Sequence, residues 1–519
     1  GAALPRLRAW PSWQLALAVL LSVYVALGLV VTCAPISSAD ALYYHAAAPE
    51  LFDQEHRIVE LPWSWHSYQP FTVEMLVLDG FLLWDAAQGA FAAFLLALGA
   101  LAAAVGAGER LAGRAVGLLA GAVFFAQPLM LWLATSTFVE PALAFAVALA
   151  CWNLARFGQS ERIESLVLAG LFAGGAAGIK YVGAAAAAVL AGAAAVWLRA
   201  RLTRARVLAF ALPALAIPLV WYARNAVLTG NPVYPFVFGG ANEEAMRAAR
   251  DSFSSYGHGR SPLDLVLLPL RLLADADEFD RGEFASPLFL LFAPVALLAP
   301  AARRAAPIVL GAVLVYTLAW FAGSQQLRLL APAMPALAVL AALGIVTLAA
   351  RGRIGRAVAV AVPAAALAGG LAVSVVYAAQ FVPVVAGRES EREFLSESSS
   401  YYDGVDWLNR NLPADARVVI DHVFALHVDR PTVVWTSDVL ESTAGPVETR
   451  AFFRRFRLTH AAVFESDATR RRQLGYVRAE RVARVMVRPV ASRTLNELGP
   501  SEPMLVFAVP GRMGAGPAG

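Results

Sequence analysis

The chain has 519 residues, of which 59% are hydrophobic and only 15% are charged, and its mean hydropathy is +0.60. This composition excludes a wholly soluble protein, and it is typical of an α-helical polytopic membrane protein. The net charge of +4 comes largely from arginines in short turns between apolar runs, without the basic-aromatic patch of a nucleic-acid binder. We therefore expect membrane lipids as partners and no nucleic acid.

Apolar runs of helical length recur over the first 380 residues. Each approaches or meets the roughly 20 residues that a helix needs to cross the hydrocarbon layer. We therefore expect about eleven membrane-spanning helices. The expected spans are 13–33, 88–106, 111–127, 138–156, 163–179, 182–198, 207–223, 286–301, 305–322, 329–349 and 356–379.

Arginines in the short connections predict the orientation, because cytoplasmic turns carry an excess of positive charge. If these turns are cytoplasmic, the longer segments 34–87 and 224–285 and everything after about 380 lie outside. The pattern requires that 71–84 is not a full crossing, and we expect a helix along or dipping into the outer interface. The arginines that define the inner side are Arg6, Arg8, Arg110, Arg114, Arg156, Arg162, Arg199, Arg201, Arg204, Arg206, Arg303, Arg304, Arg351, Arg353 and Arg356.

After the last expected span, apolar residues occur in short runs rather than in runs long enough to cross a membrane. We expect a transmembrane domain over 1–380, a linker or short amphipathic helix over 381–400, and a small extracytoplasmic α/β domain over 401–519. Within it, helices are predicted at 402–412 and 448–458, and strands at 417–420, 432–435, 461–464 and 504–509. The spacing of its histidines does not indicate catalysis, so we interpret them as loop or structural residues. They are His422, His427 and His460.

Asp40 is the first candidate for a catalytic group. It lies a few residues beyond the first apolar run, where a carboxylate near the membrane costs desolvation energy and usually has a function. Tyr43 and Tyr44 follow at positions i+3 and i+4, so a helix starting at Asp40 would place the carboxylate and both phenols on one face.

The segment from Trp63 to Pro70 is rich in aromatic and hydrogen-bonding side chains, including His66 and Tyr68. Such a segment suits a sugar or a lipid headgroup. For its tryptophans alone, an interfacial aromatic belt is the alternative interpretation.

Two further candidates are charged residues next to expected spans. Glu140 precedes Pro141, which predicts a helix N-terminus at Glu140 on the outer side; a purely structural acid is the alternative. Lys180 is the single lysine of the chain, against 41 arginines, and it lies beside Tyr181 at the outer end of a span. Snorkelling of its ammonium group to the interface is the alternative there.

Two arginines complete the set of outer-face candidates. Arg224 follows a span and precedes a turn-rich aromatic loop. Arg328 opens an apolar span from the outer side, against the positive-inside pattern. We therefore expect Arg328 to have an anionic partner.

The order of these features resembles that of the GT-C glycosyltransferases, in particular the family that contains the protein O-mannosyltransferases and the lipid A aminoarabinose transferases. The matching features are an acid after the first span, an acid followed by proline at a later span, a Gly-x-Lys turn, an outer Arg-Leu-Leu-x-Pro-x-x-Pro segment and a C-terminal domain. The sequence departs from the family in two places. Gln69-Pro70 stands where paired prolines are usual, and Glu140 stands where aspartate is frequent.

The resemblance implies a hexosyl- or pentosyltransferase of the bacterial cell envelope, multi-pass in the cytoplasmic membrane. It would move a sugar from a polyprenyl-phosphate donor to a hydroxyl of a lipid, glycan or protein acceptor at the outer face, with inversion. Asp40 would be the base, and Glu140 would orient the acceptor or share a divalent cation, Mg²⁺ or Mn²⁺, with Asp40. The cations that would bind the donor phosphate are Lys180, Arg224 and Arg328. The residues that would bind substrate are Tyr43, Tyr44, His66, Tyr68 and Tyr181.

Two other functions remain compatible with the sequence. A transporter or flippase for a lipid-linked sugar also needs polar outer-face residues, but it should show helix-breaking or charged residues near mid-membrane and paired halves. In this sequence the charges gather at the outer rim, and we find no internal repeat. A catalytically inactive GT-C-like partner subunit is the third interpretation.

Overall fold

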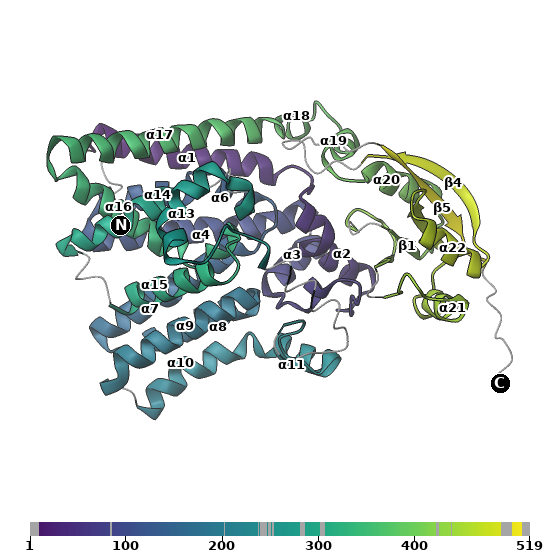
Figure 1. Cartoon of the computed structure of the whole chain (residues 1–519), viewed down its shortest axis with the longest axis horizontal. Helices are drawn as coiled ribbons and strands as arrows, with labels where there is room; N and C mark the ends of the chain where they lie inside the picture. Colours follow the sequence, from purple (N-terminus) through teal and green to yellow (C-terminus); the bar gives the residue numbers. More distant parts are fainter. Residues whose placement is uncertain are drawn as a thin grey trace. The chain divides into compact units, whose positions relative to one another are not determined.

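The computed structural model describes residues 10–83, 86–201, 203–236, 238, 247, 251, 254–280, 286–301, 307–421, 425–436, 439–488 and 501–510. The chain divides into two compact units (Figure 1). One, here called the helical unit, comprises Gly1–Thr32, Gln69–Val73 and Phe91–Ala379. The other, the sheet unit, comprises Cys33–Tyr68, Glu74–Ala90 and Gln380–Gly519. The segment after the first helix therefore belongs to the same unit as the C-terminal domain.

Long apolar helices make up most of the helical unit. Its helices are α1 (Ser12–Thr32), most of α4 (Ala86–Ala112), α5 (Arg114–Phe125), α6 (Pro128–Thr135), α7 (Glu140–Ser160), α8 (Ile163–Ile179), α9 (Tyr181–Leu198), α10 (Arg204–Ala216), α11 (Leu219–Thr229), α13 (Pro262–Ala274), α14 (Leu288–Phe292), α15 (Pro307–Ala322), α16 (Met334–Ala349) and α17 (Gly352–Ala379). Short 3-10 turns are η4 (Arg199–Arg201), η5 (Ala276–Phe279), η7 (Pro294–Leu298) and η9 (Leu327–Leu330).

By length and composition, five of the described helices can cross a membrane, namely α1, α4 from Gly89, α7, α9 and α17. The number rises to seven if α5 with α6 and α10 with α11 are each one bent span. Four shorter apolar helices occupy the remaining expected runs. The chain is thus a multi-pass membrane protein, while the expected count of about eleven spans stays a prediction.

Proline explains both bends. The α5–α6 pair bends by 68° and the α10–α11 pair by 56°. Pro128 begins α6 and Pro218 caps α11. Proline lacks the amide hydrogen and clashes with the preceding turn, so a helix changes direction there.

Small residues allow the helices to approach closely. A Cβ added to Gly170 of α8 would collide with the carbonyl oxygen of Phe210 in α10, and one added to Gly344 of α16 would collide with that of Phe292 in α14. Close backbone approach at glycine and alanine is the usual packing of membrane helices.

The sheet unit contains a mixed five-stranded sheet in the order β2-β1-β3-β5-β4. Strand β1 (Val418–Ile420) pairs in parallel with β2 (Thr432–Val434) and β3 (His460–Phe464), whereas β5 (Glu502–Ala508) is antiparallel to β3 and to β4 (Glu480–Val487). The helices near it are α18 (Val382–Val385), α19 (Glu391–Ser398), α20 (Tyr402–Asn411), α21 (Pro446–Arg455) and α22 (Ala468–Tyr476). The predicted α/β character, with its helices and strands, is confirmed. Strand β4 and helix α22 were not predicted.

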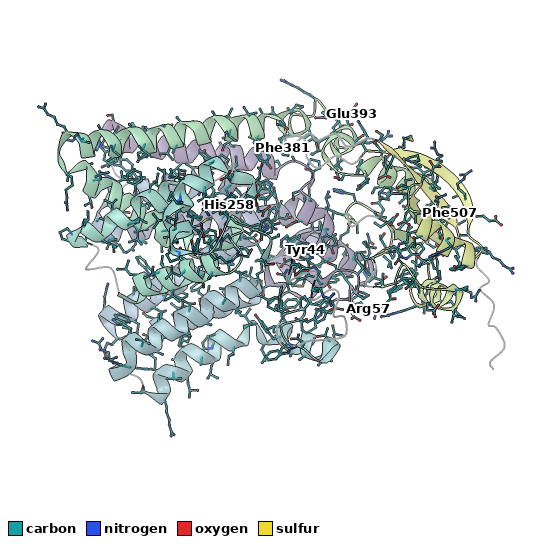
Figure 2. The ribbon with its side chains drawn as sticks, in the orientation of Figure 1. Tyr44, Arg57, His258, Phe381, Glu393 and Phe507 are labelled. Atoms are coloured by element: carbon teal, nitrogen blue, oxygen red, sulfur yellow. The ribbon has the colours of Figure 1, made fainter. Side chains whose placement is uncertain are left out.

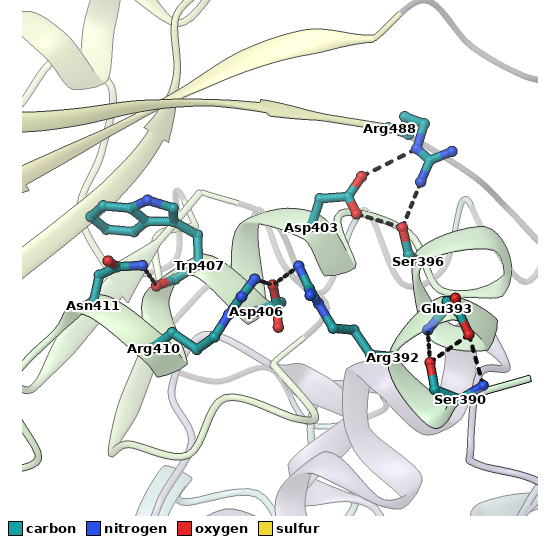
Figure 3. Close-up of polar contacts among 10 residues, drawn as sticks. All are labelled: Ser390, Arg392, Glu393, Ser396, Asp403, Asp406, Trp407, Arg410, Asn411 and Arg488. Carbon is teal, nitrogen blue, oxygen red and sulfur yellow. Dashed lines mark hydrogen bonds and ion pairs between the residues drawn. The ribbon is translucent and has the colours of Figure 1, made fainter.

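The segment 381–400, expected to be a linker or short helix, contains α18 and α19. Ser390 and Glu393 form a capping box that starts α19 (Figure 3). Asp403 of α20 accepts hydrogen bonds from Ser396 of α19 and from Arg488 (Figure 3). These contacts join the linker helix to the first helix and the β4 end of the C-terminal domain.

The N-terminal part of the sheet unit is short and irregular. Its elements are the π-helical turn η2 (Ala41–His45), α2 (Ala47–Gln54), η3 (Trp65–Tyr68) and most of α3 (Thr72–Leu83). Helix α3 matches the helix expected over 71–84; its position relative to a membrane stays a prediction. Residues Arg6, Arg8, Arg303, Arg304 and His422 lie outside the described part of the chain.

Candidate functional site

Asp40 lies at the start of the π-helical turn η2, whose backbone closes with a bond from the Ala46 amide to the Ala41 carbonyl at 3.1 Å. Single π-turns are rare in proteins as a whole, but those that occur are frequently found at functional sites. The Tyr44 hydroxyl donates to Oδ2 of Asp40 at 3.4 Å, a long hydrogen bond. This bond agrees with the prediction that Asp40 and Tyr44 lie on one face of a helical turn.

Aromatic rings gather beside Asp40 from two separate segments of the sequence. The His66 ring stacks on that of Tyr44, with centroids 4.4 Å apart, and on that of Trp65, 3.7 Å apart. The Tyr43 ring meets His66 edge-on at 5.1 Å. Figure 2 places Tyr44 among the dense side chains of this segment. Three of the predicted substrate-binding residues, Tyr43, Tyr44 and His66, are thus neighbours.

Tyr68, the fourth of these predicted residues in the sheet unit, forms a different contact. Its hydroxyl donates to Oε1 of Glu60 at 2.7 Å, and its ring is buried. This bond closes the segment between Glu60 and Tyr68.

His45 and Glu74 form a buried pair that the sequence analysis missed. Nδ1 of His45 lies 2.7 Å from Oε1 of Glu74, and the two side chains are 1% and 2% exposed. His45 ends the turn that Asp40 begins, and Glu74 belongs to α3. The pair therefore fastens the Asp40 turn to a helix. An acid within an apolar segment was the signal that could have indicated it.

In the helical unit, Glu140 and Lys180 form a buried ion pair. Nζ of Lys180 donates to Oε1 of Glu140 at 2.8 Å, with both residues almost fully buried. Glu140 begins α7 and is followed by Pro141, as predicted. Lys180 is the one extended residue between α8 and α9, with φ −160° and ψ 155°. Since its ammonium group is buried against Glu140, the snorkelling interpretation is wrong.

Arg328 has the anionic partner that its position predicted. Its Nε lies 3.1 Å from Oδ2 of Asp280, an atom that also accepts from Gln326 at 2.7 Å. The guanidinium carbon lies 5.2 Å from the centroid of the Phe138 ring, within cation–π range. Because Phe138 is two residues before Glu140, this contact brings Arg328 to the segment that carries Glu140.

Tyr181 and Arg224 meet through Asn225. The Asn225 amide donates to the Tyr181 hydroxyl at 2.9 Å and accepts from Arg224 at 3.4 Å. The Tyr181 hydroxyl in turn donates to the Tyr234 carbonyl at 2.8 Å. The prediction that Arg224 lies at the outer end of a membrane span stays a prediction, because the helix itself continues past Arg224. Helix α11 runs on to Thr229 and ends at Gly230, whose φ of 72° suits a helix C-terminus.

The predicted site residues are divided between the units. Asp40, Tyr43, Tyr44, His66 and Tyr68 belong to the sheet unit. The members in the helical unit are Glu140, Lys180, Tyr181, Arg224 and Arg328.

The predicted divalent cation has no matching set of ligands in the described residues. Within them, no group of three or more His, Cys, Asp or Glu side chains could hold a metal ion. Oε1 of Glu140 is held by Lys180, and Asp40 belongs to the other unit. A cation shared by Asp40 and Glu140 therefore stays a prediction.

The bundle of apolar helices with a small C-terminal sheet domain has the GT-C fold. The structure of ArnT from Cupriavidus metallidurans bound to undecaprenyl phosphate is similar to this chain, with a TM-score of 0.58 and 17% identity over 98% of this chain and 99% of that chain. ArnT from the same organism in the apo state gives a TM-score of 0.57 and 16% identity over 97% and 100% of the two chains. The fold that the resemblance implied is therefore confirmed.

A more distant similarity is to the oligosaccharyltransferase of Archaeoglobus fulgidus in complex with Zn and sulfate. It has a TM-score of 0.49 and 14% identity over 86% of this chain and 68% of that chain. No protein-family model and no curated protein matches the sequence.

Proposed function

We propose that this protein is a GT-C glycosyltransferase that takes a sugar from a polyprenyl-phosphate donor and transfers it to an acceptor hydroxyl at the outer face of the cytoplasmic membrane. The observation that carries the proposal is the likeness, over 98% of the chain, to an ArnT structure with undecaprenyl phosphate bound. A polyprenyl-phosphate donor places its lipid tail in the bilayer and its charged phosphate at the surface, which suits a protein with cations at helix ends.

In the proposed reaction Lys180, Arg224 and Arg328 bind the donor phosphate. Lys180 lies at the α8–α9 break and Arg328 in η9 before α16. The two acids paired with these cations, Glu140 and Asp280, leave one positive charge in excess among the five residues. A lipid phosphate would complete this arrangement by charge-assisted hydrogen bonds, which are about twice as strong as neutral ones.

Asp40 acts as the general base. The acceptor hydroxyl attacks the anomeric carbon and gives its proton to the Asp40 carboxylate, while the bond from that carbon to the phosphate oxygen breaks. The electron pair stays with the polyprenyl phosphate, which needs little protonation as a leaving group. Attack opposite the leaving phosphate inverts the anomeric carbon. Tyr43, Tyr44 and His66 offer aromatic surface beside the base for a sugar or an acceptor.

Donor cleavage by the purified protein tests this proposal. The protein, reconstituted in nanodiscs, would be given a series of polyprenyl-phosphate hexoses and pentoses together with extracted envelope lipids and glycans. We expect release of free polyprenyl phosphate from one donor, dependent on an acceptor. Movement of an intact donor across a liposome bilayer without its cleavage would contradict the proposal and support a flippase.

A further inference from the structure

The loop that follows β1 holds the backbone on both sides of Asp40. The amides of Ala425 and Leu426 donate to the carbonyl of Leu42 at 3.0 and 3.2 Å. Nε2 of His427 lies 2.8 Å from the carbonyl oxygen of Ile36. Leu42 is two residues after Asp40 and Ile36 is four residues before it. One short loop of the C-terminal domain therefore bonds to both flanks of the proposed base.

The backbone of His427, as well as its ring, is held by hydrogen bonds. Its backbone is left-handed, with φ 70°, a conformation that is uncommon for residues other than glycine. Its amide donates to Oε2 of Glu50 at 3.2 Å, and its carbonyl accepts from Asn409 at 2.7 Å. A carbonyl oxygen can only accept, so the bond to Ile36 assigns the ring proton to Nε2.

A second set of contacts joins the same two segments away from Asp40. Gln54 of α2 donates to the carbonyl of Val428 at 2.9 Å, and Arg417 donates to Glu55 at 2.6 Å. Rings of Trp63 and Phe456 also meet, with centroids 6.2 Å apart. These contacts do not involve the His427 ring, so α2 and the domain should stay together when that ring is removed.

We propose that the loop 425–428 is a clamp that fixes the Asp40 turn, and that His427 is a positioning residue acting through the Ile36 carbonyl. The inference rests on the proposed function for the role of Asp40, and it gives the C-terminal domain a part in catalysis. A base displaced by a fraction of an ångström lowers the rate, while the affinity for the donor phosphate, which other residues would bind, stays the same.

The substitution His427→Asn tests the clamp. Asparagine tolerates the left-handed backbone but is too short to replace the ring. We expect faster amide exchange in the segment 36–45, a kcat lower by about 10-fold to 100-fold, and a KM for the donor within about 2-fold of the wild-type value. The matched control is His460→Asn, because Nδ1 of that ring lies 3.0 Å from the hydroxyl of Thr459 in the same domain. It should change none of the three measurements.

Two results would overturn the clamp. One is unchanged amide exchange in 36–45 in the His427→Asn protein; the other is faster exchange together with wild-type kcat. A wild-type protein that cleaves none of the donors contradicts the proposed function instead, and amide exchange, which needs no turnover, then decides whether the clamp exists.

Discussion

Asp40 and Glu140, the two acids expected at the site, occupy opposite environments. Asp40 is partly exposed and accepts a long hydrogen bond, of 3.4 Å, from the Tyr44 hydroxyl. Glu140 is fully buried and bonded to Lys180 at 2.8 Å. A base must give access to the acceptor proton, which Asp40 does more readily than a buried, ion-paired Glu140. Glu140 is better suited to holding Lys180 in place.

Lys180→Gln should therefore have two separable effects. It leaves the Glu140 carboxylate buried beside a neutral group, which typically costs about 3–5 kcal/mol of stability. If Lys180 binds the donor phosphate as proposed, the substitution also removes a charged hydrogen bond to it, worth about 1.5–3 kcal/mol of binding. Thermal unfolding and polyprenyl-phosphate binding measure the two effects separately.

The double variant Glu140→Gln with Lys180→Gln separates structure from binding. Two amides can bond to each other without a buried charge, so much of the stability should return while phosphate affinity stays low. Wild-type phosphate affinity in the double variant would remove Lys180 from the donor site and leave it with a structural role.

At the level of elements, helix α2 has a pH-dependent contact with the clamp loop. Loss of water around Glu50 raises the pKa of its carboxyl from 4.5 to about 8; Asp429 of the loop and Asp53 of α2 add to the rise, while the bond from the His427 amide opposes it. A group whose pKa rises on folding stabilises the folded state at low pH. That contribution is complete below pH 4.5 and is lost as the pH rises through about 8.

The stability of the wild-type protein should therefore fall between pH 6 and pH 8 and level off at higher pH, and Glu50→Gln should flatten that fall. Asp421 also has a raised pKa, of about 6, because its carboxyl is desolvated, so its effect is largely complete before this range begins. Unfolding temperatures of both proteins across the range measure the difference. If the unfolding temperatures of the two proteins fell in parallel with pH, the assignment of this pH dependence to Glu50 would be contradicted.

Local signals in the sequence predicted much of the fold and part of the site. The predicted features depend on short stretches of sequence. Examples are the apolar runs, the proline after Glu140 and the positive charge of Arg328 on the outer side, which hydrophobic periodicity and charge placement indicate. The partners of these residues could not be predicted this way. Lys180 is 40 residues from Glu140, and Arg328 is 48 residues from Asp280.

The two elements that were not predicted, β4 and α22, lack a strong local pattern in the sequence. Strand β4 is at the edge of the sheet and much of it is exposed, so its apolar alternation is weak. Helix α22 has three consecutive arginines, from Arg470 to Arg472, and little apolar pattern. The clamp joins residues almost 400 positions apart, His427 and Ile36, and no local pattern indicates such a contact.

For the whole molecule, the arginines in the expected inner turns predict that the candidate residues and the C-terminal domain lie outside the cytoplasm. Single cysteines at Ser254 and Ser466 would be introduced into a protein without Cys33 and Cys151. We expect both to react with a membrane-impermeant maleimide in intact cells whose outer barrier has been permeabilised. A cysteine at Gln159 should not react.

Labelling at Gln159 together with protection of Ser466 would reverse the orientation of the C-terminal domain. A polyprenyl-phosphate sugar presented at the outer face could then not reach Asp40. The transporter interpretation would become the better one.

Transfer by an Asp40→Asn protein is the most direct test of the proposed chemistry. Asparagine has nearly the same shape as aspartate but cannot accept the acceptor proton, so we expect kcat for donor cleavage to fall by about 10²-fold to 10⁴-fold, as for the loss of a general base. The unfolding temperature and polyprenyl-phosphate affinity should stay close to wild type. The matched control Asp79→Asn changes an exposed aspartate of α3 and should retain full turnover. Near-normal turnover by Asp40→Asn would contradict the proposed mechanism and exclude Asp40 as the base.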